Sequence, residues 1–365
     1  MSHEAPLTRV AAAAYEIPTD APEADGTLEW DRTVLVVVEI EAGGQTGLGY
    51  TYAEGSIVQL IEGKLGSVIS ERSAFDIAGA NGALWRSIRN LGRSGLVATA
   101  ISAVDAALWD LKAKLLGTSV AALLGCCRET VSIYGSGGFT TYADKQLRNQ
   151  LSGWTERDGC RWVKMKIGSD PARDPERVAV ARDAIGDAGL FVDANGAFQA
   201  KQALALAERI AEHDVRWFEE PVTSDDVVGL ALVRDRAPAG MDIAAGEYGY
   251  NLDDFRRLLE LPSIDVLQAD VTRCGGITGF MQVAALCEAR HIELSGHCAP
   301  ALHLHAACAA PRLRHLEWFH DHVRIERMLF DGAPEPRDGE IAPDFSRPGF
   351  GLVFKKRDAE RFRIG

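Results

Sequence analysis

Short apolar runs, each ending in a polar or glycine-containing cluster, recur along the chain from about residue 131. They read VSIYGSGG, WVKMKIG, LFVDANG, RWFEEPV, MDIAAGEY, IDVLQAD, IELSGHC and RHLEWF, and alanine-rich helical stretches follow them. Parallel strands need helical crossovers, and eight of them close a sheet on itself. The pattern therefore predicts an α/β fold, a (β/α)8-type, TIM-like barrel over residues 129–325.

The first 128 residues follow a different pattern. LTRVAAAAYEIP and TVLVVVEIEAGGQTGLGYTYAEG predict antiparallel strands, and LVATAISAVDAALWDLKAKLLG predicts a helix that ends at Gly117. The tail, GLVFKKRDAERFRIG, predicts a strand and a short polar segment. We expect residues 1–128 to form an α+β capping domain, to which residues 326–365 return.

One segment of the predicted cap has no periodicity. Residues 16–31, EIPTDAPEADGTLEWD, combine proline, glycine and acidic residues. This composition favours a loop, and we expect the loop to cover the mouth of the barrel.

Polar side chains stand at the ends of consecutive predicted strands, 20 to 28 residues apart. The carboxyl ends of barrel strands meet at one mouth, so these side chains are expected to converge. They are Lys166, Asp193, Glu219, Glu247, Asp270, His297 and Glu317.

Three of these residues, Asp193, Glu219 and Glu247, are carboxylates. Three converging acids without a cation would repel one another, so a hard divalent metal is the simplest way to keep them ionised. Oxygen-only ligation favours Mg²⁺, with Mn²⁺ as the alternative. Only one of Glu219 and Glu220 can face inward, and alternation alone does not say which. The competing interpretation is that the acids cap helices or face solvent.

Two lysines, Lys164 and Lys166, share one side of a strand that is otherwise apolar. At an effective dielectric constant of ~20, two ammonium groups ~6.5 Å apart repel by about 2.5 kcal/mol, which lowers their pKa. A lysine with a lowered pKa can act as a general base. The competing interpretation places both side chains at the protein surface.

Asp270 and His297 end the next two strands after the acids. An aspartate that accepts a hydrogen bond from one imidazole nitrogen raises the basicity of the other, which makes a proton-transfer dyad, unless the pair is merely structural. Glu317 would donate a hydrogen bond to developing negative charge if its pKa were raised; otherwise it is a surface acid. Seven of the nine histidines lie between residues 291 and 322, but a zinc site at His303 and His305 is disfavoured because i and i+2 diverge on a helix.

Composition and charge exclude several classes of partner. The formal charge of −13 argues against nucleic acid and anionic membrane surfaces, which require clustered Lys and Arg. Seven cysteines without a CxxC pair fit a reducing compartment. The sequence starts without a basic segment followed by an apolar one, and no apolar run approaches the ~20 residues of a membrane helix. We therefore expect a soluble, cytoplasmic protein.

The motifs KMK, VDAN, FEEP, AGEY, QADVTRCGGITG and SGHCAP resemble those of the enolase superfamily, and within it the mandelate racemase subgroup. AISAVDAALWDLKAKLLG is similar to the cap of that family, so the resemblance spans nearly the full chain. It implies that Asp193, Glu219 and Glu247 bind Mg²⁺, and that Asn195 supports this site or contacts the substrate.

The same resemblance implies roles for the remaining polar residues. Lys166 would be a base on one face of the substrate, and the Asp270–His297 dyad would be an acid or base on the other. Lys164 would hold the substrate carboxylate, and Glu317 would hydrogen-bond to it opposite the metal. Removing a proton beside a carboxylate gives an enediolate, which needs a metal, a cation and hydrogen-bond donors around it.

This intermediate has two common outcomes: reprotonation on the opposite face, as in racemases and epimerases of 2-hydroxy acids, or loss of a β-hydroxyl to give a 2-keto-3-deoxy acid. Hydrogen-bonding groups in residues 16–31 favour a polyol, and their negative charge disfavours a second carboxylate. We therefore expect a dehydratase that acts on a monocarboxylic sugar acid.

Two other classes of protein remain as alternatives. A Schiff-base aldolase would use Lys164 or Lys166 covalently but leaves the three acids unexplained. A non-catalytic acid-sugar binding protein would keep the metal without exchanging a substrate proton. The family resemblance also implies a homo-oligomer.

Overall fold

The computed structural model describes residues 5–365. Its N-terminal part is built on an antiparallel sheet with the order β15-β1-β2-β3. The strands are β1 (Arg9–Ala24), β2 (Glu29–Ala42), β3 (Gln45–Tyr52) and the short C-terminal β15 (Arg363–Ile364). Gly43 and Gly44 join β2 to β3 with φ of 55° and 76°, and a two-residue turn with both φ values positive matches the right-handed twist of the strands.

Several helices follow this sheet, and one of them is the alanine-rich helix that the sequence predicted. They are α1 (Ile57–Leu60), the π-helical η1 (Ile61–Leu65), α2 (Gly66–Ile69), α3 (Ile77–Ser87), α4 (Leu96–Leu115) and α5 (Val120–Leu124). The alanine-rich helix α4 lies close against β3. A Cβ at Gly47 or Gly49 would lie 2.2 or 2.1 Å from the carbonyl oxygens of Ala107 and Ala103, so this contact requires glycine.

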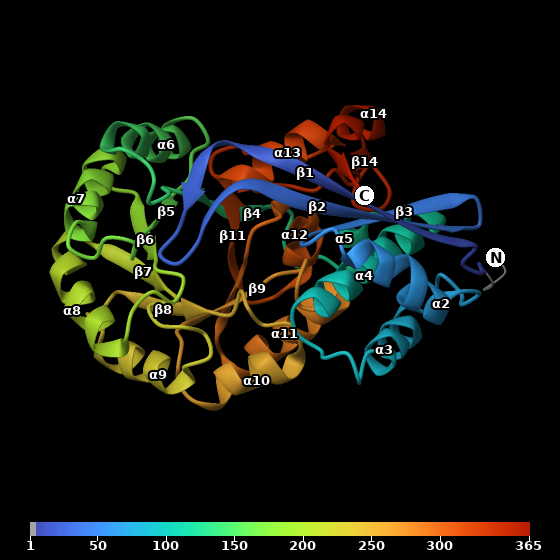
Figure 1. The fold of residues 1–365 in the computed structure, drawn as a ribbon, viewed down its shortest axis with the longest axis horizontal. Coiled ribbons are helices and arrows are strands. Elements are labelled where there is room, and N and C mark those ends of the chain that lie inside the picture. The colour runs from blue at the N-terminus through green and yellow to red at the C-terminus, as the bar shows by residue number, and fades with distance from the viewer. Residues whose placement is uncertain (1–4) are drawn as a thin grey trace.

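Eight parallel strands form the barrel, at the left of Figure 1. They are β4 (Val131–Gly137), β5 (Trp162–Lys166), β6 (Gly189–Asp193), β7 (Val215–Glu219), β8 (Asp242–Ala245), β9 (Val266–Ala269), β10 (Glu293–Gly296) and β11 (Leu313–Phe319). Each strand pairs with its neighbours in sequence, and pairing of β11 with β4 closes the barrel. The eight strands are those that the apolar runs predicted.

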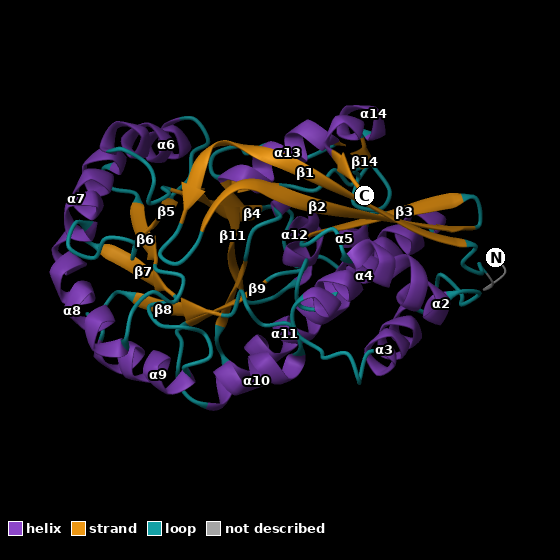
Figure 2. Ribbon diagram, in the orientation of Figure 1, coloured by secondary structure: helices purple, strands orange, loops and turns teal. Residues whose placement is uncertain are grey.

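Helices surround the strands on the outside, as Figure 2 shows in purple around orange. They are α6 (Asp144–Glu156), α7 (Asp174–Ile185), α8 (Ala200–Ile210) with η2 (Ala211–His213), α9 (Val227–Arg236), α10 (Leu252–Glu260), α11 (Gly276–Arg290), α12 (Pro300–Ala309) and α13 (His320–Leu329). The short β13 (Glu340–Ile341) pairs antiparallel with β4. The chain thus combines a TIM-like barrel with an α+β cap.

Alternation along the barrel strands decides which side chains point into the barrel. Phe191 and Trp217 pack together inside it, with ring centroids 5.2 Å apart. Two residues further along the same strands, Asp193 and Glu219 are register partners and are fully buried. Period 2 therefore puts the acids on the inward side, above a layer of aromatic rings.

Residues 16–31 do not form the loop that we predicted. They lie mostly in β1 and β2, which continue as a long hairpin over Pro18 and Pro22 with a register shift between residues 18 and 23. The hairpin reaches from the cap to the strand ends of the barrel (Figure 1). Its tip meets the barrel: Thr140 N donates to Ala24 O at 2.9 Å. The predicted position over the mouth is right, whereas the predicted loop is wrong because both prolines fit an irregular strand pair.

The C-terminal residues complete both parts of the molecule. β12 (Phe330–Asp331) pairs with β14 (Val353–Phe354), and α14 (Lys356–Ala359) and η3 (Glu360–Phe362) lead into β15. β15 pairs antiparallel with β1. Within residues 5–365, no helix combines the length and the apolar character needed to cross a bilayer.

Candidate active site

The carboxylates of Asp193, Glu219 and Glu247 come together at the ends of β6, β7 and β8. All three are buried, and one carboxylate oxygen from each lies within 4.8 Å of the others. Asp193 Oδ1 accepts from the backbone N–H of Asn195 at 2.9 Å, and Glu219 Oε2 accepts from Trp217 Nε1 at 2.9 Å. These bonds fix both carboxylates while each keeps an oxygen that faces the cluster.

Both lysines of β5 contact these acids. Lys164 Nζ donates to Glu219 Oε1 at 2.5 Å and lies 2.9 Å from Glu317 Oε1. Lys166 Nζ donates to Asp193 Oδ2 at 2.6 Å and to Asn195 Oδ1 at 3.0 Å. The side chain of Lys164 is fully buried and that of Lys166 nearly so, so the two ammonium groups belong to the barrel interior and not to the surface.

The direction of the lysine pKa shifts is opposite to our prediction. Burial alone would lower the pKa of both groups, but Glu219 and Glu317 beside Lys164, and Asp193 beside Lys166, outweigh burial and raise both pKa values. The prediction considered the repulsion between the two lysines, which is weaker than their direct contacts with carboxylates.

His297 and Asp270 form the predicted dyad. His297 Nδ1 lies 2.8 Å from Asp270 Oδ2, and Oδ1 of the same carboxylate accepts from Thr272 N at 2.6 Å. We infer from this contact that Nδ1 carries a proton and donates it to the Asp270 carboxylate. Nε2 is then the nitrogen that can accept or deliver a proton. Nε2 lies 3.0 Å from Glu247 Oε2, so the dyad adjoins the acid cluster.

Glu317 lies in the site but is not the protonated donor that we expected. Burial alone would raise the pKa of Glu317, but Lys164 and His297 outweigh burial and lower it. Its Oε1 accepts from Ser136 Oγ at 2.5 Å and its Oε2 from Cys298 N at 3.0 Å. Both oxygens of Glu317 accept hydrogen bonds, and the lowered pKa favours its ionised form.

The choice between Glu219 and Glu220 has a structural answer. Glu219 is the residue whose oxygen joins the cluster. Glu220 follows the end of β7 with φ of 39°, and it is also buried although alternation allows only one inward glutamate. Its Oε1 has no hydrogen-bond partner, and burial, followed by the neighbouring Glu247, raises the pKa of Glu220.

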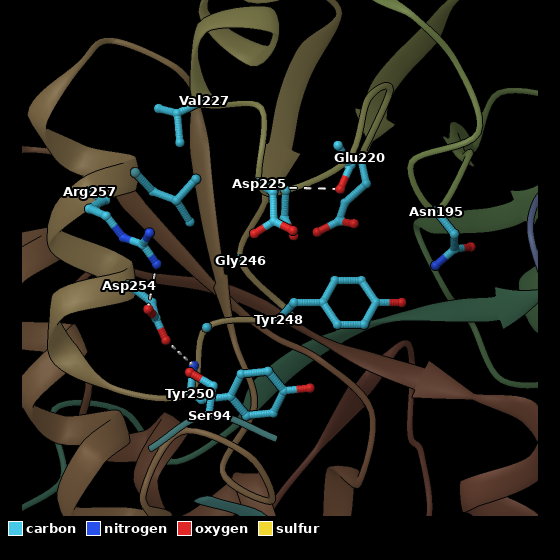
Figure 3. A pocket seen from close by; sticks show the side chains of 14 residues that line it. Ser94, Asn195, Glu220, Asp225, Val227, Gly246, Tyr248, Tyr250, Asp254 and Arg257 are labelled. Carbon is cyan, nitrogen blue, oxygen red and sulfur yellow. Dashed lines mark hydrogen bonds and ion pairs between the residues drawn. The ribbon is translucent and has the colours of Figure 1, made fainter. Parts of the chain in front are cut away.

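A cavity of about 430 Å³ lies beside the acids, over the ends of β6 to β8. Figure 3 shows Asn195, Glu220 and Tyr248 on its walls. Its hydroxyl-bearing side chains come from Ser94, Thr223, Ser224, Tyr248 and Tyr250. Its charged side chains are Glu220, Asp225, Asp254 and Arg257, and Arg257 is already paired with Asp254 at 2.7 Å. The cavity is therefore rich in hydroxyl groups, and its basic side chain is already paired.

Other polar residues near the site have structural partners. His303 Nε2 accepts from Val271 N, and His305 Nδ1 accepts from Ala121 N, so both histidines of HLH bond the backbone. Arg273 lies 3.5 Å from Asp270 and 3.7 Å from Glu247. Tyr52 stacks on His322 at 3.5 Å between ring centroids, whereas its buried hydroxyl has no hydrogen-bond partner among the described residues.

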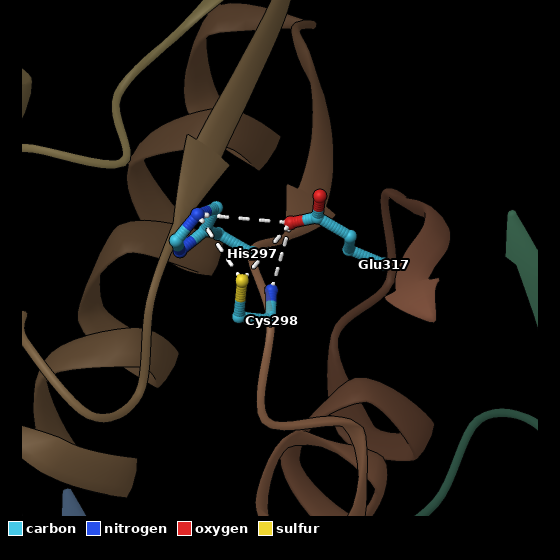
Figure 4. Close-up of side chains that lie close together, drawn as sticks. All are labelled: His297, Cys298 and Glu317. Carbon is cyan, nitrogen blue, oxygen red and sulfur yellow. Dashed lines mark hydrogen bonds and ion pairs between the residues drawn. The ribbon is translucent and has the colours of Figure 1, made fainter. Parts of the chain in front are cut away.

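Sequence reasoning missed two residues at this site, Ser136 and Cys298. Ser136 is two residues from the inward-facing Tyr134 on β4, so alternation could have found it. Cys298 Sγ lies 3.3 Å from His297 Nε2 and 3.4 Å from Glu317 Oε2 (Figure 4). Its φ of 53° turns the chain toward Glu317, which no sequence pattern indicates.

The acid cluster fits a divalent cation. Its ligand atoms are all oxygen, as Mg²⁺ prefers, and they are buried close together. Burial and the neighbouring Asp193 raise the pKa of Glu219 to about 8. A bound cation would favour the ionised carboxylate and so lower this pKa.

Family models match most of the chain. Residues 14–125 match the N-terminal domain of mandelate racemase / muconate lactonizing enzyme, and residues 146–359 match the enolase C-terminal domain-like family. The chain belongs to the mandelate racemase subgroup of the enolase superfamily. The predicted resemblance is thus confirmed.

Named members of the family are enzymes. A 3,6-anhydro-alpha-L-galactonate cycloisomerase of Streptomyces coelicolor is 32% identical over 98% of this chain and 100% of its own length. An L-talarate/galactarate dehydratase of Salmonella typhimurium is 31% identical over 85% of this chain and 78% of its own. A D-gluconate dehydratase of Thermoproteus tenax is 30% identical over 96% of this chain and 72% of its own length. This chain is accordingly an enzyme of a family that includes dehydratases.

Solved structures agree with this fold along nearly the whole chain. A mandelate racemase/muconate lactonizing enzyme-like protein from Rubrobacter xylanophilus is 48% identical with a TM-score of 0.96, covering 98% of this chain and 100% of that one. A racemase from Streptomyces coelicolor A3(2) with bound magnesium is 31% identical with a TM-score of 0.92, also covering 98% and 100%.

Proposed function

We propose that this enzyme is a Mg²⁺-dependent dehydratase that converts a monocarboxylic sugar acid to a 2-keto-3-deoxy acid. The observation that carries the proposal is the convergence of three buried carboxylates, two lysines and a histidine–aspartate dyad at one barrel mouth. Dehydratases among the relatives support the reaction class. The relative with bound magnesium supports the metal.

The proposed roles follow from position. Asp193, Glu219 and Glu247 would hold the metal, which would neutralise charge on the substrate carboxylate. Lys164 lies between Glu219 and Glu317 and would bind the same carboxylate. A fixed ammonium group there stabilises charge that grows when the α-proton leaves.

Proton transfer is assigned to Lys166 and His297. Lys166 lies on β5, while His297 follows β10, three strands away through β11 and β4. The two groups would therefore flank the bound substrate. Lys166 would take the α-proton, and His297, oriented by Asp270, would deliver a proton to the departing β-hydroxyl. Asn195, which accepts from Lys166, would orient its ammonium group.

The preference for one carboxylate rests on the cavity and no longer on residues 16–31. Asp20 of that segment pairs with His320 at 3.0 Å, and Asp25 accepts from the backbone of its own turn. Burial, followed by Asp321, raises the pKa of Glu23 to about 8, so it carries little charge at pH 7. The cavity walls instead carry many hydroxyl groups, which suits a polyol. Arg257, the basic side chain among the residues that line the cavity, is already paired with Asp254, which disfavours binding of a second carboxylate.

The test is a panel of sugar acids incubated with the enzyme and Mg²⁺, with detection of 2-keto product. We expect product from aldonic acids, none after chelation of the metal, and little from aldaric diacids. Exchange of the α-proton in D₂O without keto product would show a racemase or epimerase instead. Turnover of diacids alone would refute the preference for one carboxylate.

A second candidate, ring opening, has one observation in its favour. The cycloisomerase relative matches 98% of this chain and all of its own length. Loss of a β-oxygen that belongs to a ring requires the same proton abstraction as loss of a β-hydroxyl. An anhydro sugar acid in the same panel separates the two, because only ring opening would give a product of unchanged mass.

The aldolase alternative is less well supported. A Schiff base forms without a metal, so the aldolase alternative leaves the buried cluster of Asp193, Glu219 and Glu247 unexplained. Borohydride trapping with EDTA present would detect such an adduct, and we expect none.

A further inference from the structure

A second cluster of potential metal ligands lies at the barrel mouth, beside the acid cluster. It consists of His297 Nε2, Cys298 Sγ and Glu317 Oε2 (Figure 4), all buried. The reaction proposed above has no use for the thiol of Cys298. Together the three atoms offer a nitrogen, a sulfur and an oxygen, which differs from the all-oxygen set that suits Mg²⁺.

The distances within this cluster are close to those around a tetrahedral zinc ion. A tetrahedral ion with ligand bonds of about 2.0–2.3 Å separates nitrogen, oxygen and sulfur ligands by roughly 3.3–3.6 Å. The nitrogen–sulfur, sulfur–oxygen and nitrogen–oxygen distances are 3.3, 3.4 and 3.7 Å. The three side chains therefore already form one face of a suitable tetrahedron, and the fourth position can hold water.

The surroundings orient two of the three ligands. Asp270 lies 2.8 Å from His297 Nδ1, so Nε2, which lies 3.3 Å from Cys298 Sγ and 3.0 Å from Glu247 Oε2, is the nitrogen that a metal can reach; zinc-bound histidines commonly have such a carboxylate partner. Ser136 donates to Glu317 Oε1 at 2.5 Å and leaves Oε2 facing Cys298. The left-handed backbone of Cys298 and Ala299, with φ of 53° and 37°, holds the thiol against both.

We propose that His297, Cys298 and Glu317 form a binding site for Zn²⁺ that adjoins the acid cluster but uses different ligands. Binding forms three ligand bonds, and the thiol proton of Cys298 leaves to solvent. Because Nε2 of His297 is then occupied, Zn²⁺ also inhibits the enzyme. Inhibition rests on the proposed function, whereas binding does not.

The test needs a background without competing thiols and with Mg²⁺ present. Cys126 and Cys127 are the exposed cysteines among residues 5–365, so Cys126→Ser with Cys127→Ser serves as the parent. Co²⁺, which substitutes for Zn²⁺, gives a near-ultraviolet charge-transfer band only with a thiolate ligand. We expect this band in the parent and its loss on adding Cys298→Ala. The control, Cys287→Ala at a buried cysteine of α11, should keep it.

Zinc affinity separates the two metal sites. Loss of a residue that only supports a metal ligand lowers metal affinity about 10- to 100-fold. Cys298 is proposed as a ligand itself, so Cys298→Ala should weaken Zn²⁺ binding at least about tenfold in a chelator competition. Asp193→Asn should leave the cobalt band in place. A band that persists without Cys298, or zinc affinity that depends on Asp193 but not on Cys298, would overturn the proposal.

X-ray absorption of the zinc-loaded parent tests the same site without changing it. We expect one sulfur at about 2.3 Å with nitrogen and oxygen ligands; a spectrum without sulfur would refute the site. A protein that binds zinc in this way but forms no 2-keto product would contradict the proposed function and leave the zinc site intact.

Discussion

At the scale of single residues, Lys166 is the sharpest test of the proposed chemistry. Lys166→Met removes the amine and should lower kcat by about 10²- to 10⁴-fold, the usual contribution of a general base. Steady-state kinetics at saturating Mg²⁺, together with α-proton exchange in D₂O, measure the loss. Lys201→Met, at an exposed lysine of α8, is the control and should leave kcat unchanged. A Lys166→Met enzyme that still exchanges the α-proton at the original rate would assign the base elsewhere.

The residues of the site were largely predictable because strand ends converge in a parallel barrel. Spacing alone indicated that Asp193 and Glu247 would meet, and it also placed His297 beside Asp270. It could not predict ionisation, because the pKa of Lys166 and of Glu317 depends on which carboxylates and ammonium groups touch.

At the scale of elements, the contact between β3 and α4 depends on glycine. A Cβ at Gly49 would lie 2.1 Å from Ala103 O, so Gly49→Ala must push the helix from the sheet. We expect a loss of about 2 kcal/mol or more of unfolding free energy, as for overpacked cores, measured by urea denaturation. Gly63→Ala is the matched control: a Cβ there meets nothing within 4 Å, and helix propensity should make it slightly stabilising.

The tip of the β1–β2 hairpin offers a second test at this scale. A Cβ at Gly26 would lie 2.5 Å from Ala194 O and 2.7 Å from Ile167 O, and these residues directly follow Asp193 and Lys166. Gly26→Ala should therefore lower kcat/KM at least about tenfold, since small displacements of reacting groups are costly. Leu28→Ala, at a side chain 64% exposed on the same tip, should retain activity. Unchanged kinetics for Gly26→Ala would mean that the tip does not position the site.

The elements themselves show where sequence patterns succeed and fail. The eight apolar runs correspond to the eight barrel strands. A strand covered on both faces carries apolar residues on both sides, so its sequence is a nearly continuous apolar run and not an alternation of apolar and polar residues. The hairpin was mistaken for a loop because Pro18 and Pro22 normally interrupt strands. Here they lie beside a register shift, where few backbone hydrogen bonds are lost.

At the scale of the whole molecule, one buried acid joins the cap to the barrel. Tyr50 of β3 donates to Glu326 Oε1 of α13 at 2.6 Å, and burial raises the pKa of Glu326 from 4.5 to about 8. The folded state therefore keeps a proton that the unfolded state loses. The stability this proton provides is complete below about pH 4.5 and is lost as the pH rises through about 8.

Glu326→Gln should remove this pH dependence, because glutamine does not ionise. The melting temperature of the variant relative to the original protein should rise between pH 5 and pH 8.5, whatever its offset at pH 5. Differential scanning fluorimetry across this range measures the trend. If the difference in melting temperature between the variant and the original protein stayed constant or fell with pH, the raised pKa of Glu326 would be contradicted.

The strand at the end of the chain joins the sheet at its beginning, since β15 pairs with β1. Arg363 and Ile364 pair with Tyr15 and Ala14, so this pairing closes a loop that contains the whole barrel. Contacts between residues so distant in sequence form slowly, and we therefore expect this edge of the first sheet to form late in folding. A purification tag fused to Gly365 would lie beside β1, at the sheet edge and not at the barrel.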